Sequence, residues 1–278
     1  MYSIYHFFAH LVKNKSLLQS ETFLSNFPFA ANMLSCQNNG IFPDLAIRTN
    51  RPNPLFTGGE LIELKDSKSY TVSSFNSTIP TGTKEMSKII KGKNSIVKKQ
   101  MEEAGDDIDL LPIREVFYLI RGKKQNSIKV VLIHGNFFET VKSNKLISQS
   151  FEQVLNERLQ EKGINIEADI QNLLVDIFSE QENFSKLRNV DNSSVKLRFR
   201  IMTEVKAEGN ILNTRKYPDI KDNTINLIVP CHSIQDEELA IKRMSSICDL
   251  NEFTTLKIKH LLNGYFFVFQ QNFDDVRT

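Results

Sequence analysis

Short runs of alternating apolar and polar residues recur along the chain, and each of them predicts a β-strand. We expect strands at residues 41–48, 60–65, 114–121, 127–139, 195–206, 224–230 and 265–270. Apolar residues at helical spacing predict helices at 4–35, 84–105, 144–162, 166–188 and 235–249. The polar segment 73–83 has no usable period and predicts a loop. Because strands and helices alternate, we expect an α/β fold, a mixed central β-sheet flanked by helices.

The first two predicted strands carry the charged residues of greatest interest. They are joined by a loop rich in Pro, Asn and Gly at 50–59, which favours an antiparallel pair. Side chains two positions apart on a strand point to the same face. Glu63 and Lys65 therefore project together, while their neighbours point into a core, and the pairing brings Asp44 beside Glu63.

Carboxylates on adjacent strands suit a hard cation, because Mg²⁺ prefers oxygen ligands. A lysine side chain beside them can orient an attacking water as an ammonium, or deprotonate it as a neutral amine. Hydrolysis of a phosphodiester needs these parts: a positioned metal, an activated water and a stabiliser of the developing charge. Asp44, Glu63 and Lys65 therefore predict a catalytic site for Mg²⁺-dependent hydrolysis.

The residues Pro43-Asp44, followed by Glu63-Leu64-Lys65, resemble the PD-(D/E)XK nuclease superfamily, which includes most type II restriction endonucleases. The match covers about residues 41–66. By this resemblance, the carboxylates of Asp44 and Glu63 are metal ligands and Leu64 adds its backbone carbonyl. Lys65 is then the group that serves the water.

Further expectations follow from the same resemblance. It implies a restriction-endonuclease-like core in a single nuclease domain over 1–278, with the core at about 1–145 and a possible DNA-recognition or dimerisation subdomain at about 146–278. Members often add a carboxylate from an N-terminal helix, and Glu21 is the only acidic residue before Asp44. The implied activity is cleavage of a short, specific double-stranded DNA sequence with Mg²⁺ by a homodimer, because duplex DNA offers a two-fold target.

Two other interpretations of the motif stay open. The E-x-K pattern occurs once more, at Glu204-Val205-Lys206, with Asp191 upstream of it, and a second Pro-Asp pair ends at Asp219. A surface strand also often pairs Glu with Lys for solubility alone. Of these sets, 44/63/65 has every part in order, with predicted strands on both sides.

Two other functions also stay open. One is a repair or junction-resolving nuclease with the same core, and the other is a non-catalytic DNA-binding protein. The absence of a P-loop or GxGxxG sequence gives no support to a nucleotide cofactor.

A candidate DNA-binding surface follows the motif. Lys84, Lys88 and Lys91 have the spacing of one face of a helix. The loop before them is rich in hydroxyl and amide groups, and such groups and lysines hold phosphates. We expect 73–99 to line a DNA cleft, although a solvated charged helix is an alternative. The candidate loop residues are Ser73, Ser74, Asn76, Ser77 and Thr78.

Composition narrows the class of protein. The 278 residues are 40% hydrophobic and 24% charged, which is ordinary for a soluble globular protein, and no apolar stretch predicts a membrane span. The net charge is only +2, so any basic surface for DNA must be local. Three cysteines without a CxxC pair favour a reducing, cytoplasmic location. The adjacent pair Cys231-His232 and the strand residue His134 are interpreted as structural.

Overall fold

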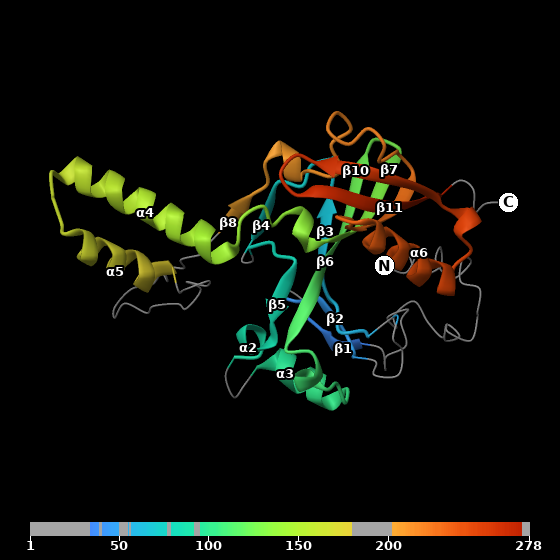
Figure 1. Ribbon diagram of the computed structural model, residues 1–278, viewed down its shortest axis with the longest axis horizontal. Helices are drawn as coiled ribbons and strands as arrows, with labels where there is room; N and C mark the ends of the chain where they lie inside the picture. The colour runs from blue at the N-terminus through green and yellow to red at the C-terminus, as the bar shows by residue number, and fades with distance from the viewer. Residues whose placement is uncertain are drawn as a thin grey trace. The chain divides into compact units, whose positions relative to one another are not determined.

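The computed structural model describes residues 34–38, 41–49, 55, 57–76, 79–91, 95–179 and 202–273 (Figure 1). The chain divides into two compact units. Unit 1 lies within Met1–Val72, Gly82–Phe137 and Lys206–Thr278, and unit 2 lies within Ser73–Thr81 and Phe138–Val205. This division differs from the one expected near residue 145, because the C-terminal strands belong to the same unit as the N-terminal strands.

Unit 1 is built on a mixed sheet, in which nine strands take part among the described residues. Their order is β1-β2-β3-β6-β7-β9-β11-β10, and β5 pairs with β6. β3 runs parallel to β6 and β7 runs parallel to β9, whereas the other neighbours are antiparallel. The strands are β1 (Leu34–Gln37), β2 (Leu45–Ile47), β3 (Leu61–Ser67), β5 (Thr83–Glu85), β6 (Ile113–Lys124), β7 (Ser127–His134), β9 (Thr224–Pro230), β10 (Thr254–His260) and β11 (Gly264–Asn272). The predicted mixed α/β class is therefore confirmed.

One face of this sheet packs against helix α6 (Ile234–Ile247), as Figure 1 shows. The helix begins at a capping box in which the Ser233 side chain and the Asp236 side chain each accept a backbone N–H. Met244 faces a cluster of buried side chains from β6, β7, β9 and β11, which includes Leu119 and Phe267. Burial of this apolar surface fixes the helix on the sheet.

The opposite face carries several buried polar side chains. Gln270 bonds to Asn226 at 2.8 Å, and it also donates to the carbonyl of Asp219 at 2.9 Å. The ammonium group of Lys129 donates to the carbonyl of Ile220. Both acceptor carbonyls lie in the segment between Gly209 and Thr224, so this segment covers the second face of the sheet.

A buried ion pair links the end of β2 to the start of β6. Arg114 Nη1 lies 2.8 Å from Asp106 Oδ2, and both side chains are inaccessible to solvent. Asp106 also accepts hydrogen bonds from the backbone N–H and the hydroxyl of Thr49, at 3.1 Å and 2.8 Å. Asp106 follows helix α3 (Ile96–Glu103), which lies after the short helix α2 (Met86–Ile89). The pair therefore joins these helices to the sheet.

Unit 2 contains two helices and a small sheet. Helix α4 (Ser143–Lys162) ends at Gly163, whose φ of 63° is the left-handed conformation favoured by glycine. Helix α5 (Ala168–Ser179) packs back on α4, where the rings of Phe151 and Phe178 stack at 5.3 Å. Strand β4 (Ser74–Asn76) pairs antiparallel with β8 (Met202–Glu204).

Several predicted elements differ from the structure. The expected loop 73–83 contains strand β4 and the start of β5, because both segments find strand partners far along the chain. Of the expected helix 84–105, Lys84 and Glu85 lie in β5, and α2 and α3 follow. Strand β10 was not predicted. Of the expected helix 4–35, Leu34 and Ser35 lie in β1, and the rest falls outside the described residues.

Within the described part of the chain, no helix has both the length and the apolar character needed to cross a membrane.

The three cysteines, Cys36, Cys231 and Cys248, are buried as free thiols. The Sγ of Cys231 lies 3.7 Å from the carbonyl of Ser233, and His134 accepts the N–H of Asn136 at its Nδ1 atom.

Removal of the buried carboxylate should strongly destabilise unit 1. We expect Asp106→Ala to lower the free energy of unfolding by about 3–5 kcal/mol, because it leaves a buried guanidinium without its counter-charge. The control is Asp66→Ala, which breaks the exposed ion pair between Asp66 and Arg121 and should cost less than about 1 kcal/mol. Urea denaturation measures both values, and equal losses would contradict the structural role of the buried pair.

The same carboxylate gives a pH dependence with a defined sign. Burial by itself would raise the pKa of Asp106, but the hydrogen bonds from Arg114 and Thr49 outweigh burial and hold that pKa below its ordinary value of 3.8. Its contribution to stability is therefore complete above the ordinary pKa and is lost as the pH falls through the lower, folded-state pKa. The stability difference between the wild type and Asp106→Asn, measured by urea denaturation, should shrink below about pH 4. A difference that grows on acidification would contradict this.

Candidate active site

Strands β2 and β3 bring two carboxyl groups together. They pair antiparallel with Leu45 opposite Ile62, so one step further along the register places Asp44 opposite Glu63. The predicted antiparallel pairing is therefore confirmed. The Oδ2 atom of Asp44 accepts a hydrogen bond from the backbone N–H of Leu64 at 2.8 Å. This bond fixes the direction of the Asp44 carboxylate, which lies just before the start of β2.

Glu63 is held between a like charge and an opposite charge. Its side chain is largely buried, with the residue 9% exposed. The Lys65 ammonium donates to its Oε1 atom at 2.9 Å. Burial raises the pKa of Glu63, the neighbouring Asp44 carboxyl raises it further, and the Lys65 ammonium opposes both effects. The charges of Asp44 and Lys65 therefore both act on Glu63. We call Asp44 and Glu63 the acid pair, and we name Lys65 separately.

The pleat of β3 explains how this charged group is supported. Ile62 and Leu64 pack against the apolar cluster beneath α6. Glu63 and Lys65 project from the other face, where the strand partner of Glu63 is Tyr118, a residue only 1% exposed. Because apolar neighbours fix β3 on one side and β6 flanks it, the acid pair stands on a rigid base.

The donor atoms present fit a hard divalent cation. Asp44 and Glu63 supply carboxylate oxygens, and these are the ligands that Mg²⁺ prefers. A strand residue presents its N–H and its C=O toward the same neighbouring strand. Since the N–H of Leu64 bonds to Asp44, its carbonyl faces the same side, as the motif requires.

Among the residues that the structure describes, no third acidic, histidine or cysteine ligand joins this group. Among the described residues, no group of three or more His, Cys, Asp or Glu side chains could hold a metal ion. Glu21, the expected additional carboxylate, lies outside the described residues. The fit to a cation therefore depends on two carboxylates and a backbone carbonyl.

The prediction that Lys84, Lys88 and Lys91 lie on one face of a helix is wrong. Lys84 lies in β5, where Arg114 of β6 is its partner, so strand pairing overrides the local helical pattern. Lys88 lies in α2, with its ammonium 3.8 Å from Glu85, and Lys91 is exposed after that helix ends. These three lysines do not share one helix face.

The segment rich in hydroxyl and amide groups, which was predicted to be a loop, contains a strand. Ser74 and Asn76 lie in strand β4 of unit 2, and the carbonyl of Ser73 accepts the N–H of Val205 at 3.0 Å. Ser77 and Thr78 fall outside the described residues. Binding of DNA by these residues stays a prediction.

The rival E-x-K set is on a different element. Glu204 ends strand β8 of unit 2 and is exposed, and Lys206 follows it. Asp191, which would complete that set, lies outside the described residues. Among the described residues of the two E-x-K patterns, a contact between the acidic and the basic side chain is seen for Glu63 and Lys65.

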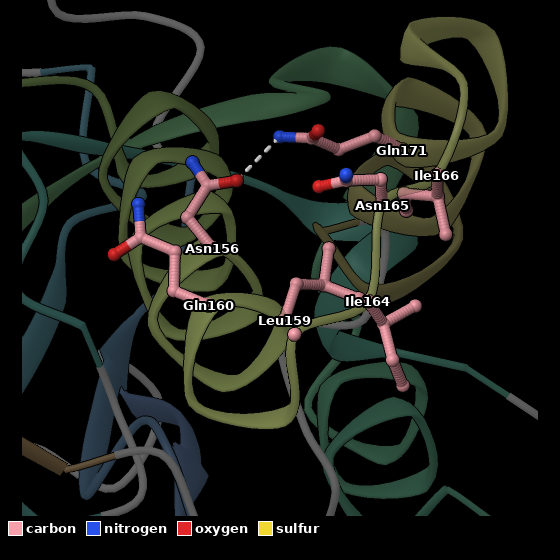
Figure 2. Close-up of a pocket in the computed structure, with 8 residues that line it drawn as sticks. Asn156, Leu159, Gln160, Ile164, Asn165, Ile166 and Gln171 are labelled. Carbon is pink, nitrogen blue, oxygen red and sulfur yellow. Dashed lines mark hydrogen bonds between the residues drawn. The ribbon is translucent and has the colours of Figure 1, made fainter.

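A hollow of about 400 Å³ lies in unit 2 between α4 and α5 (Figure 2). Figure 2 shows the side chains of Asn156 and Gln171 joined across it by a hydrogen bond of 2.7 Å. The lining consists of amide and aliphatic residues together with Gly163. Such a lining suits hydrogen bonding, and it offers no acid–base or metal chemistry comparable to that of the acid pair.

Comparison of the chain with protein-family models, with curated proteins and with solved structures gave no match. The resemblance to the PD-(D/E)XK superfamily therefore rests on the motif residues Pro43-Asp44 and Glu63-Leu64-Lys65. The geometry of these residues is the observation that bears on function.

Two substitutions at Asp44 separate its hydrogen bond from its charge. Asp44→Asn keeps an oxygen acceptor for the Leu64 N–H and removes the repulsion with Glu63, so its free energy of unfolding should equal or exceed that of the wild type. Asp44→Ala leaves that N–H without its acceptor and should cost about 1–3 kcal/mol. Urea denaturation in a chelating buffer measures both, and an equal loss in the two variants would contradict the described contact.

Proposed function

We propose that the protein is a Mg²⁺-dependent endonuclease that hydrolyses phosphodiester bonds at a specific short sequence of double-stranded DNA, as type II restriction enzymes do. The observation that carries this proposal is the placement of the Glu63 carboxyl between a second carboxyl, that of Asp44 on the neighbouring strand, and the ammonium of Lys65, which it contacts. This group has the order of the PD-(D/E)XK motif: Asp44 after a proline, then Glu63 and Lys65.

Each residue of the motif would have its own role in hydrolysis. A bound Mg²⁺ supplies a Lewis acid for the phosphoryl oxygen and lowers the pKa of bound water. Asp44 and Glu63 would hold the cation, with the Leu64 carbonyl as a further ligand. Lys65 would orient the attacking water as an ammonium, or accept its proton in the neutral amine form. The Lys65 ammonium offsets part of the charge of Glu63, since it contacts that side chain at 2.9 Å.

A homodimer is part of the proposal. Each copy has one acid pair on its sheet, and cleavage of both strands of a duplex calls for two such sites related by the two-fold symmetry of the DNA. A single defined sequence as target distinguishes this proposal from a nuclease that acts on a DNA shape.

The proposal is tested by incubation of the full chain with plasmid DNA and Mg²⁺. The wild type should give discrete bands on a gel. Asp44→Asn and Glu63→Gln should lower the cleavage rate by about two to three orders of magnitude or more, because each removes charge that holds the cation. Binding of a short duplex, measured by fluorescence anisotropy, should stay largely intact.

Matched controls are present in the chain. Asp219→Asn alters the other Pro-Asp pair, and Glu204→Gln alters the other E-x-K pattern; both residues are exposed. Neither substitution should change the cleavage rate. Equal cleavage by the wild type and Asp44→Asn would end the claim for this site, and a smear in place of bands would contradict sequence specificity.

Cation binding gives a readout that does not depend on cleavage. A ligand that binds the folded state alone stabilises it by an amount that grows with its concentration. Mg²⁺ should therefore raise the Tm of the wild type in a dose-dependent manner and should leave the Tm of Asp44→Asn nearly unchanged. The same shift in both proteins would show that Mg²⁺ binds elsewhere.

A further inference from the structure

Strand β1 extends the sheet face that carries the acid pair. Its register on β2 places Gln37 opposite Leu45, so one step further along places Asn38 opposite Asp44. The backbone N–H of Asn38 donates to the carbonyl of Asp44 at 3.0 Å, which agrees with this pairing. Residues that are opposite each other on paired strands project from the same face. The side chain of Asn38 therefore stands beside the Asp44 carboxylate.

Three polar side chains form a hydrogen-bonded network at this position. The Nδ2 atom of Asn38 lies 2.7 Å from the Sγ of Cys36, and that Sγ lies 3.1 Å from the Oε1 of Gln100. The same Oε1 atom accepts the backbone N–H of Gln37 at 3.1 Å. Gln100 belongs to helix α3, which packs against β1. The network therefore ties the side chain of Asn38 to a helix.

The chemistry of the donors fixes the direction of each hydrogen bond in this network. A backbone N–H can only donate, so the Gln100 atom that contacts Gln37 is the amide oxygen. The thiol of Cys36 must then donate its one proton to that oxygen. Burial raises the pKa of Cys36 to about 11, against a smaller opposite effect of the hydrogen bond from Asn38, so the thiol keeps its proton at neutral pH. The sulfur is left to accept from the amide nitrogen of Asn38, and the Oδ1 atom of Asn38 is turned away from the sulfur.

The amide oxygen of Asn38 has the chemistry and the spacing of an outer contact to a cation. Mg²⁺ takes oxygen ligands and usually keeps several of its waters. Asn38 is half-buried and stands one strand beyond Asp44, a step of about 4.8 Å in a sheet. A water between the cation and an acceptor spans a similar distance, because a Mg–O bond is about 2.1 Å and an O–H···O hydrogen bond is about 2.8 Å. A cation on Asp44 is therefore within reach of Asn38 through one water.

We propose that the Oδ1 atom of Asn38 accepts a hydrogen bond from a water on the cation of the acid pair, and that Cys36 and Gln100 hold Asn38 in this orientation. This inference rests on the cation site of the proposed function. Lys65 lies on β3, on the other side of Asp44 from β1. The water held by Asn38 is therefore distinct from the one that Lys65 would serve. Asn38 is a positioning residue, which strengthens binding of the cation without touching it.

The test is the Kd of Mg²⁺, measured by calorimetric titration of the full chain with MgCl₂ and without DNA. Asn38→Leu removes the oxygen at nearly constant volume and should weaken binding roughly tenfold or more, as the loss of an outer contact does at other metal sites. Asn38→Asp keeps an oxygen acceptor and adds charge, so its affinity should equal or exceed that of the wild type. A purely structural role would give a loss in both variants, because an ionised carboxylate cannot donate to the sulfur of Cys36.

The matched control is the neighbouring residue of the same strand. Gln37 is exposed and projects from the opposite face, so Gln37→Leu should leave the Kd of Mg²⁺ unchanged. Cys36→Ala keeps the Asn38 oxygen but removes its support, and it should weaken binding less than Asn38→Leu does. Urea denaturation in a chelating buffer verifies that each variant folds.

Failure of this inference and failure of the proposed function give different results. If Asp44→Asn abolishes Mg²⁺ binding while Asn38→Leu keeps the wild-type Kd, the role of Asn38 is overturned and the cation site stands. Equal losses in Asn38→Leu and Asn38→Asp also overturn it. If the wild type binds Mg²⁺ no better than Asp44→Asn does, both proposals fail. If the Asn38 variants behave as expected but the wild type does not cut DNA, the inference stands and the nuclease function fails.

Discussion

One electrostatic constraint underlies the candidate site: two carboxyl groups are held against each other although they repel. The register of β2 and β3 places Asp44 opposite Glu63. The N–H of Leu64 holds one carboxylate in place, and the ammonium of Lys65 offsets part of the charge on the other. Two like charges side by side lower the stability of the folded protein, and such a loss is typical of functional sites. A pair of surface charges with a structural role would instead place opposite signs together.

The rest of unit 1 supports this arrangement. On one face of the sheet, the apolar side chains of β3 pack beneath α6, and on the other face the strand partner of Glu63 is the buried Tyr118. The parallel pairing of β3 with β6 supports the same strand along its second edge.

Local patterns predicted the pairing of β2 with β3 better than they predicted the elements around it. The alternation in β3 and the short Pro- and Gly-rich connection before it were enough to place Asp44 beside Glu63. Lys84 was assigned to a helix because its partner in β6, Arg114, lies 30 positions away, and local propensity does not register such pairing. The ion pair between Asp66 and Arg121 was not predicted for the same reason, because the two residues are 55 positions apart. Tertiary pairing decided what local sequence could not.

The most direct measurement is the anomalous scattering of a crystal grown with Mn²⁺ in place of Mg²⁺. Manganese takes the same oxygen ligands and reveals its own position. The account predicts a peak within about 2.0–2.3 Å of carboxylate oxygens from both Asp44 and Glu63. A structure in which Mn²⁺ binds elsewhere while these two groups stay unbridged would contradict the central claim.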